Sequence, residues 1–342
     1  MNTGFNAIGC SKDTRRADLF TLAFRLPLMQ QRILKNAFTD RWLFGMLRGG
    51  TAKIRVRELL KQCGEQGVSR PVFIVGCGRS GTTMLGTALS KHDGITYLHE
   101  RRDLWISAYP QTDVWTAKAS ARGGKVKLAA SHSNARRSHK LRRTFRLELA
   151  KSGRPVLLEK LPINSFRLEF IQSIFPKARY IHIHRNGVEV AKSIERFCAQ
   201  KQWFGSDQYK WQQLSEVANM RTATSELPRL CKTDFEKGLL EWRLGTEEVM
   251  RFLSTLPETR WCEISYDELT ACPVTSIERI LSFIGLASHS ATIEFARNSI
   301  FRRTAKVEQI SLSEPQRHIG GPLLPISMAG ESEITRRYSH LP

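Results

Sequence analysis

A short apolar run that leads into a glycine-rich loop constrains the fold of this chain more than any other feature. Val72–Val75 is apolar throughout, which is typical of a strand buried on both faces of a parallel sheet. The loop sequence GCGRSGTT follows at residues 76–83, and a helical stretch runs from about 81 to 91. A strand, a glycine-rich loop and a helix in this order predict a nucleotide-binding unit of an α/β domain.

The loop is close to the phosphate-binding pattern GxxxxGK[ST] but departs from it at one position. Gly76 and Gly81 have the expected spacing, and Thr83 stands at the hydroxyl position. Thr82, however, replaces the lysine that reaches the β- and γ-phosphates in kinases and ATPases. The positive charge comes earlier, at Arg79, whose guanidinium can bind phosphate oxygens. The loop therefore suits a phosphate held at a helix N-terminus, without a γ-phosphoryl group to transfer.

Apolar runs and amphipathic stretches alternate along the rest of the chain. Alternating strands and helices predict a parallel sheet covered by helices on both faces. We therefore predict an α/β fold, a P-loop-like three-layer sandwich with a central parallel sheet. The predicted strands are 72–75, 95–98, 156–158, 179–184 and 261–264, and the predicted helices are 81–91, 163–174, 187–197, 235–256 and 273–284.

Composition divides the chain into three parts. Residues 1–69 form a basic, mostly helical N-terminal extension, 70–300 form the α/β domain with an insertion at 101–150, and 301–342 form a C-terminal segment. Aromatic side chains and arginines mix within 19–47, which predicts either an amphipathic helix on an anionic membrane surface or a helix packed against the domain. No apolar stretch approaches the roughly 20 residues of a membrane-spanning helix.

The chain is strongly basic, which favours an acidic partner. Lys and Arg number 53 against 32 Asp and Glu, for a formal net charge of +21. Between 118 and 151 there are 11 basic residues and one acid, Glu148, so this run is either a solvated surface or a site for an anion. No helix-turn-helix, zinc-finger or RNA-binding motif is present, so a nucleic-acid partner is not predicted.

The cysteines bear on the cellular location of the protein, and the histidines bear on metal binding. The seven cysteines are scattered and form no CxxC pair, which favours a reducing compartment. We expect a cytoplasmic protein, with membrane association through 19–47 as an addition. His182 and His184 alternate along one predicted strand, but no acidic or cysteine partner stands at metal-ligand spacing. No metal is therefore predicted.

Three segments together resemble the sulfotransferases that use 3′-phosphoadenosine-5′-phosphosulfate (PAPS). They are 71–85 with the glycine loop, 159–168, which begins EKLPINSF, and 175–193, which contains YIHIHRNGVEVAKS; the segment ISYDEL at 264–269 is a weaker match. The sequence is more similar to bacterial carbohydrate sulfotransferases and protein-tyrosine sulfotransferases than to the small-molecule enzymes, which usually carry a lysine where Arg79 stands. The extension, the 101–150 segment and the C-terminal segment carry no family motif.

The resemblance implies two anion sites, one for each phosphate end of PAPS or of its product 3′-phosphoadenosine-5′-phosphate (PAP). Arg185 directly follows a predicted strand, and Ser193 lies two helical turns further on. Both can therefore face the sheet edge where such ligands bind. The resemblance assigns Arg79, Ser80, Gly81, Thr82 and Thr83 to the 5′-phosphosulfate, and Arg185 and Ser193 to the 3′-phosphate.

The resemblance also implies the catalytic groups. Glu100 follows the second predicted strand, 21 residues after Arg79, where tyrosine sulfotransferases place a general base. His99 is the alternative base, because the small-molecule enzymes use a histidine. Lys160 and Arg79 are expected to stabilise charge on the leaving oxygen. The structural alternatives are that Glu100 pairs with a neighbouring arginine at 101 or 102, and that Lys160 pairs with Glu159.

The sequence predicts the acceptor of the sulfuryl group in less detail than the donor. The basic run at 118–151 favours a hydroxyl on an anionic carbohydrate or glycolipid, and a protein tyrosine is the alternative acceptor. A P-loop kinase is the alternative enzyme, against which the missing lysine counts. Tryptophans outside the family motifs are expected either to stack on sugar rings or to pack in the domain; they are Trp105, Trp115, Trp203 and Trp211.

Overall fold

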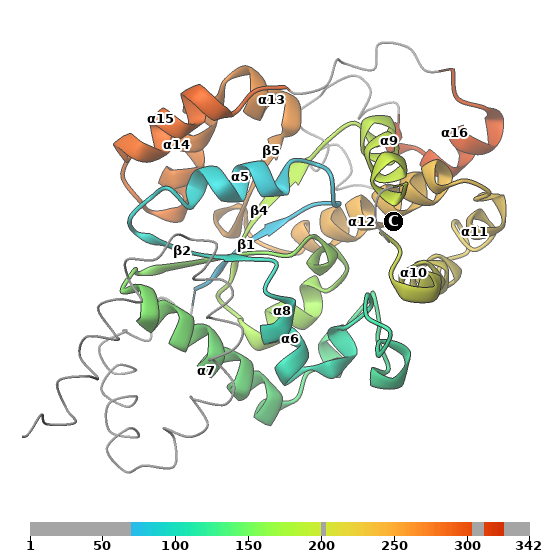
Figure 1. Cartoon of the computed structure of the whole chain (residues 1–342), viewed down its shortest axis with the longest axis horizontal. Helices are drawn as coiled ribbons and strands as arrows, with labels where there is room; N and C mark the ends of the chain where they lie inside the picture. The colour runs from blue at the N-terminus through green and yellow to red at the C-terminus, as the bar shows by residue number, and fades with distance from the viewer. Residues whose placement is uncertain (1–69, 200–202, 303–310, 325–342) are drawn as a thin grey trace, which may run out of the picture. The chain divides into compact units, whose positions relative to one another are not determined.

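The computed structural model describes residues 70–199, 203–302 and 311–324 (Figure 1). The N-terminal extension, with its proposed amphipathic segment at 19–47, lies outside these residues. So does most of the C-terminal segment, of which the described part forms the helix Glu314–Gly320. Within the described ranges no helix is long and apolar enough to cross a membrane.

Five parallel strands form one sheet in the order β2-β3-β1-β4-β5, which confirms the predicted parallel sheet. β1 lies at the centre of the sheet, between β3 and β4. After β1 the chain forms β2 and β3 on one side of it, and then β4 and β5 on the other side. Such a switch point opens a crevice at the carboxyl ends of the strands. The strands are β1 (Val72–Val75), β2 (Ile95–His99), β3 (Val156–Lys160), β4 (Arg179–His184) and β5 (Trp261–Ser265).

Helices cover both faces of this sheet (Figure 1). One layer consists of α5 (Thr82–Leu89), α13 (Tyr266–Ala271), α14 (Pro273–Ile284) and α15 (Ser290–Ser299). The other consists of α6 (Arg102–Ala108), α7 (Ala135–Ser152), α8 (Leu168–Ile174), α9 (Gly187–Cys198) and α12 (Asp234–Leu253). Three further helices, α10 (Tyr209–Asn219), α11 (Leu227–Leu230) and α16 (Glu314–Gly320), pack against α12. Short 3-10 helices lie at Pro110–Thr112, Ser120–Arg122, Ala130–His132, Pro162–Phe166, Ser206–Gln208 and Glu258–Arg260.

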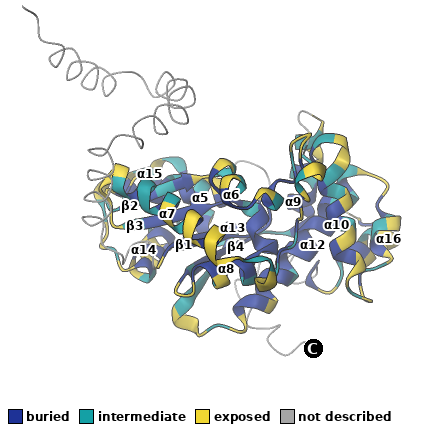
Figure 2. Ribbon diagram, turned by 90° about the horizontal axis from the view of Figure 1, so that it is seen from below, coloured by how far each residue is buried: buried dark blue, intermediate teal, exposed yellow. Residues whose placement is uncertain are grey.

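The central strand is buried on both faces because its side chains alternate between two cores. Phe73 and Val75 join the larger apolar cluster, toward α12, whereas Val72 and Ile74 join the smaller one, toward α5. In Figure 2, the strands at the centre of the sheet are dark blue, the colour of buried residues. Burial of one such side chain contributes about 1.5–3 kcal/mol. The uninterrupted apolar run that opens the domain is thus explained by its central place in the sheet.

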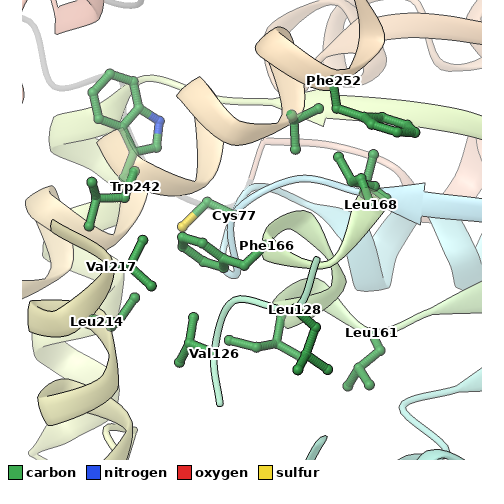
Figure 3. Packing of buried hydrophobic residues seen from close by; sticks show 14 of the residues in the cluster. Cys77, Val126, Leu128, Leu161, Phe166, Leu168, Leu214, Val217, Trp242 and Phe252 are labelled. Atoms are coloured by element: carbon green, nitrogen blue, oxygen red, sulfur yellow. The ribbon is translucent and has the colours of Figure 1, made fainter. Parts of the chain in front are cut away.

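The larger core continues up to the glycine-rich loop. Figure 3 shows Cys77 of the loop beside Phe166, in the cluster that also holds Trp242 of α12. Burial raises the pKa of the Cys77 thiol, with a smaller contribution from a nearby carboxylate. This cysteine is therefore a packing residue that anchors the loop on α12 rather than a reactive thiol.

The structure adds detail to the sequence prediction in two segments. The helix predicted at 163–174 is divided at Arg167, whose fully buried guanidinium donates to the carbonyl oxygens of Val126 (3.1 Å), Lys125 (2.7 Å) and Thr112 (2.9 Å). Burial lowers the pKa of Arg167 to about 9. The segment 101–150 supplies α6 and α7, and α7 covers β2 and β3 with one buried apolar stripe: Leu141, Phe145 and Leu149.

Candidate active site

The predicted site residues come from the carboxyl ends of neighbouring strands. The glycine loop follows β1, Glu100 follows β2, Lys160 ends β3, and Arg185 follows β4. His99 and Lys160 are partners in the β2–β3 register, and the Glu100 amide donates to the Lys160 carbonyl oxygen at 2.9 Å. The strand order β2-β3-β1-β4 therefore brings together four segments that are far apart in the sequence.

The loop conformation explains its glycines. A Cβ on Gly76, which has φ +144°, would lie 2.1 Å from the Ile183 carbonyl oxygen on β4. Gly81 has φ +96° and caps the N-terminus of α5. Arg79 takes the left-handed region at φ 74°, which is costly for a residue with a side chain and is typical of functional loops. The Ser80 hydroxyl is buried, and none of the described residues gives it a hydrogen-bond partner.

Lys160 is the centre of the predicted catalytic group. Its buried Nζ donates to Glu100 Oε1 at 2.6 Å and to Thr83 Oγ1 at 3.0 Å. The second carboxylate oxygen, Glu100 Oε2, accepts from Arg102 at 3.3 Å, and the Arg102 guanidinium lies 3.9 Å from the centre of the Trp115 ring. Glu100 also has a positive φ of 48°. One lysine thus links a P-loop hydroxyl to the candidate base.

The structure shows the contacts of Glu100, Glu159 and His99, for which the sequence had left alternatives open. Glu100 does pair with Arg102, in addition to Lys160. Glu159 instead points to the opposite side of β3 and accepts from Trp105 Nε1 at 3.0 Å and from Asn164 Nδ2 at 3.2 Å. Complete burial raises the pKa of Glu159 to about 7. The His99 ring stacks on Tyr97, with 5.6 Å between centroids.

The predicted phosphate-binding residues, with the exception of the buried Ser80, line one cavity of about 580 Å³. Arg79 Nε donates to Ser193 Oγ at 3.0 Å, and Arg185 Nη1 donates to the Arg79 carbonyl oxygen at 3.3 Å. The predicted residues on the cavity wall are Arg79, Gly81, Thr82, Thr83, Arg185 and Ser193. Residues that sequence analysis had not assigned complete the wall, among them Arg196, Phe197 and Tyr266.

Charge is distributed unevenly over this site. Burial lowers the pKa of Arg79, and the neighbouring cations Arg185 and Arg196 lower it further. Burial alone would raise the pKa of Glu100, but the charge and hydrogen bond of Lys160, with the charge of Arg102, bring it below its ordinary value. The cavity is therefore cationic, and the carboxylate beside it is ionised at neutral pH.

A family model described as the sulfotransferase family matches residues 71–290. The chain belongs to the sulfotransferase family. The matched range spans the whole sheet and the four segments that build the site. No curated protein sequence matches the chain.

Solved structures similar to this sulfotransferase are bacterial enzymes or enzyme domains. Sulfotransferase STF9 from Mycobacterium avium is 16% identical, with 92% of this chain and 85% of that chain covered and a TM-score of 0.48. The sulfotransferase domain from the curacin biosynthetic pathway is 14% identical, with 80% and 91% covered and a TM-score of 0.44. Sulfotransferase STF1 from Mycobacterium tuberculosis H37Rv is 16% identical, with 85% and 88% covered and a TM-score of 0.44.

The four tryptophans that sequence analysis placed outside the family motifs have different surroundings in the sulfotransferase. Trp105 is fully buried and bonds Glu159, so it packs and cannot stack on a sugar. Trp115 supports Arg102 beside the candidate base. Trp203 donates to Glu241 at 2.7 Å and lies where a Cβ on Gly78 would meet it at 2.6 Å. Trp211 is partly buried against the larger core.

Some site residues of the sulfotransferase were missed by sequence analysis. Tyr266 lies within the weakly matching ISYDEL segment, and its ring lies 4.0 Å from the Arg185 guanidinium carbon. Arg196 follows Ser193 by one helical turn, a spacing that would have placed both on one face of α9. His182 and His184 are buried near Glu263, and no group of three metal-ligating side chains occurs in the part of the chain that the structure describes.

Proposed function

We propose that this enzyme transfers the sulfuryl group of PAPS to an acceptor hydroxyl, with Glu100 as general base. The observation that carries the proposal is the hydrogen-bonded series Thr83–Lys160–Glu100, in which Thr83 lines an arginine-lined cavity. A P-loop hydroxyl, a buried cation and an ionised carboxylate are the groups that an in-line transfer between two oxygens needs.

The cavity residues support PAPS as the donor. The 5′-phosphosulfate would be held by Arg79, Gly81, Thr82 and Thr83 at the N-terminus of α5. The hydroxyl of Ser80, in the same loop, is buried without a hydrogen-bond partner among the described residues, but it does not line the cavity. Arg185 and Ser193, which line the same cavity, would hold the 3′-phosphate. Because the cavity is rich in cations, a bound polyanion would relieve the repulsion that lowers the pKa of Arg79.

The chemistry assigned to each residue follows from its position. PAPS supplies the sulfuryl group when bound. As the acceptor oxygen bonds to sulfur, Glu100 takes the hydroxyl proton, and the bond from sulfur to the bridging oxygen breaks with its electron pair going to PAP. Lys160 and Arg79 stabilise the charge on that oxygen. The reaction needs no change of oxidation state, and its products are the sulfate ester, PAP and a protonated Glu100.

The acceptor that we propose carries its hydroxyl on an anionic carbohydrate or glycolipid, with a protein tyrosine as the alternative. Arg102 and Trp115 stand next to Glu100 and offer a cation and an aromatic face to an incoming acceptor. The basic run at 118–151 adds exposed arginines on α7, including Arg136, Arg137 and Arg143, which we assign to binding of the anionic acceptor. The cysteines of the described residues are free, which fits the cytoplasmic location proposed from the sequence.

Calorimetric titration of PAP tests the donor assignment. Wild type is expected to bind PAP, and Arg185→Ala to weaken binding about 10- to 100-fold, because a charge-assisted hydrogen bond is lost. Glu100→Gln is expected to bind PAP like the wild type, because Glu100 is not part of the cavity wall. If the wild type binds ATP but not PAP, the kinase alternative replaces the sulfotransferase reaction proposed here.

A further inference from the structure

We propose that the loop at 113–116 is a positioning element for the candidate base, in which Trp115 holds Arg102 against Glu100. The proposal rests on the proposed function, since Glu100 is the general base of that reaction. The loop lies in the 101–150 segment, which carries no motif of the sulfotransferase resemblance. Trp115 contacts Arg102 and acts on the base through that residue, so it is a positioning residue and not a catalytic one.

The backbone of Trp115 is held from two sides. On one side, the fully buried carboxylate of Asp113 accepts from the Trp115 amide at 3.2 Å. The same carboxylate accepts from the Thr116 hydroxyl at 2.5 Å and pairs with Arg122 at 2.5 Å. On the other side, the Trp115 carbonyl oxygen accepts from the Ser206 amide at 3.1 Å. Hydrogen bonds to an ionised carboxylate are among the stronger ones in proteins, so the loop keeps a fixed conformation.

The loop is also anchored to the rest of the domain. Arg167 donates to the carbonyl oxygens of Thr112, directly before the loop, and of Lys125, which follows it. The segment that begins at Gly205 packs closely on the loop, because a Cβ there would lie 2.7 Å from the Val114 carbonyl oxygen. A loop that is tied at its ends and packed along its length leaves the tryptophan ring little freedom to move.

The Trp115 ring fixes one of the two cations that contact Glu100. The Arg102 guanidinium carbon lies 3.9 Å from the ring centre, and Arg102 Nη2 donates to Glu100 Oε2 at 3.3 Å. Within the described residues, the Arg102 side chain forms no ion pair other than this one. A long arginine side chain without the ring would sample several rotamers, and its charge would act on Glu100 for only part of the time.

The ring does for Arg102 what burial does for Lys160. The Lys160 side chain is fully buried, whereas the Arg102 side chain is 41% exposed and depends on the stacking contact for its position. A substitution at 115 leaves the identity of the other titratable groups around Glu100 unchanged; these groups are Arg79, Tyr97, His99, Glu159 and Lys160. A change in Glu100 in such a variant therefore reports on Arg102.

Carbon-13 NMR titration of Glu100 in the full chain tests the proposal. Trp115→Leu is expected to raise the pKa of Glu100, by no more than Arg102→Gln raises it, because the charge of Arg102 lowers this pKa. Trp115→Phe keeps an aromatic face and is expected to leave the pKa close to that of the wild type. The double variant is expected to match Arg102→Gln alone, since residues that act through one contact do not have additive effects.

Trp211→Leu is the matched control. Trp211 is also a partly buried tryptophan beside a cation, with Lys237 Nζ 5.6 Å from its ring centre, but it lies on α10. Its replacement is expected to leave the Glu100 pKa unchanged. The positioning role is refuted by an unchanged Glu100 pKa in Trp115→Leu, by an additive shift in the double variant, or by an equal shift in Trp211→Leu.

Calorimetric titration of PAP separates this proposal from the proposed function. Trp115 is not part of the cavity wall, so Trp115→Leu is expected to bind PAP within about twofold of the wild type. A loss as large as that in Arg185→Ala would mean that the substitution disturbs the whole site, which refutes the positioning role. If the wild type does not bind PAP, the proposed function fails, whereas the pKa comparison still decides whether Trp115 positions Arg102.

Discussion

Glu100, the proposed general base, is held by contacts at both its side chain and its backbone. Its two oxygens accept from different cations, Lys160 at 2.6 Å and Arg102 at 3.3 Å, and its backbone is in the left-handed region. The β2–β3 pairing fixes the backbone, since the Glu100 amide bonds the Lys160 carbonyl. A group fixed at both backbone and side chain loses little freedom when an acceptor arrives, which favours efficient proton transfer.

Removal of Arg102 should make Glu100 a stronger base. Burial raises the pKa of Glu100, and Lys160 and then Arg102 lower it, so the folded-state pKa lies below the ordinary 4.5. In Arg102→Gln one lowering charge is lost, and the Glu100 pKa is expected to rise. Carbon-13 NMR titration of the side-chain carboxylates, assigned with Glu100→Gln, measures this shift.

Arg101 provides the control for this prediction. It is adjacent in sequence and carries the same charge, but it pairs with Asp103 and Glu148. Arg101→Gln is therefore expected to leave the Glu100 pKa nearly unchanged. Equal shifts in both variants would show that net charge, and not the Arg102 contact, controls the carboxylate.

At the scale of elements, the glycine loop depends on its contact with β4. Gly76 needs both a positive φ and space, because a Cβ there would lie 2.1 Å from the Ile183 carbonyl oxygen. A backbone atom of a central strand cannot move aside as a side chain would. The first residue of the loop is therefore held against the sheet, and this contact restricts the positions of Arg79 and Ser80.

Gly76→Ala should cost much more stability than a glycine replacement at another positive φ. Gly153, which ends α7, has φ +70° and open space around its Cβ. Gly153→Ala is expected to cost only the left-handed backbone penalty, about 1–2 kcal/mol. Gly76→Ala has that penalty and the clash as well, so its loss in free energy of unfolding in urea should clearly exceed that of Gly153→Ala. Equal losses would mean that the loop can move away from β4.

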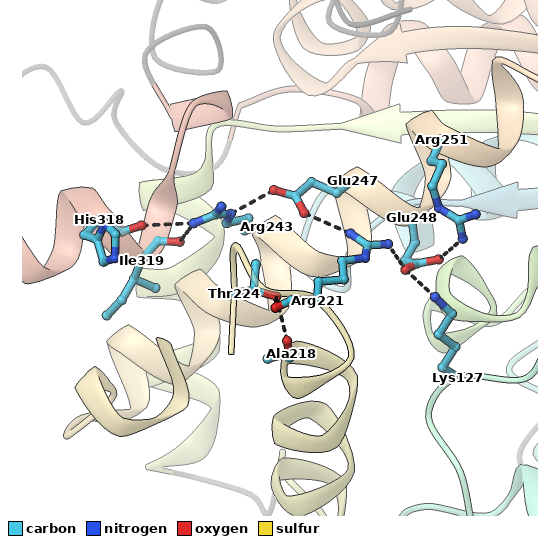
Figure 4. Close-up of polar contacts among 10 residues, drawn as sticks. All are labelled: Lys127, Ala218, Arg221, Thr224, Arg243, Glu247, Glu248, Arg251, His318 and Ile319. Carbon is cyan, nitrogen blue, oxygen red and sulfur yellow. Dashed lines mark hydrogen bonds and ion pairs between the residues drawn. The ribbon is translucent and has the colours of Figure 1, made fainter. Parts of the chain in front are cut away.

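At the scale of the whole domain, an ionic network centred on the buried Glu248 joins segments that the sheet does not connect (Figure 4). Glu248 of α12 accepts from Lys127 at 2.7 Å and from Arg251 at 2.6 Å, and it also pairs with Arg221. Arg243, on the same helix, donates to the His318 carbonyl oxygen of α16 at 3.0 Å. The 101–150 segment and the C-terminal helix are thus attached to α12 by charged hydrogen bonds.

Glu248→Gln should destabilise the domain in a pH-dependent way. Burial raises the pKa of Glu248, but its cationic partners outweigh burial and hold it below the ordinary value. The ionised form is therefore stabilising above the unfolded-state pKa, and this stability is lost as the pH falls through the folded-state pKa. The expected loss is about 3 kcal/mol at pH 7, near the lower end of the cost of breaking a buried ion pair, and it should shrink toward acidic pH.

Urea denaturation at pH 7 and at a pH below 4.5, the ordinary pKa of a glutamate, measures this difference. Glu216→Gln, at an exposed position of α10, is the control and should change stability little at either pH. A loss in Glu248→Gln that stays constant with pH would show that shape, and not charge, is what the network requires.

The sequence by itself determined the architecture and the location of the site. Strand and helix periods are local properties, so the apolar run at 72–75, the glycine loop and the later alternation were enough to predict a parallel sheet. In such a sheet, residues that follow strands meet at one edge, which predicted that Arg185 and Ser193 face this edge. The roles expected for Arg79, Glu100 and Lys160 came from the resemblance to sulfotransferases.

Only the tertiary structure decided which side chains are partners. Lys160 follows Glu159 in sequence, but side chains alternate along β3, so the two point to opposite faces of the sheet. Because β3 lies between β2 and β1, Lys160 donates hydrogen bonds to Glu100 and Thr83. Arg196 entered the cavity because α9 faces the loop, a relation between elements that no local pattern contains. Partner choice depends on through-space distances between segments up to a hundred residues apart, and these are set by packing of the whole domain.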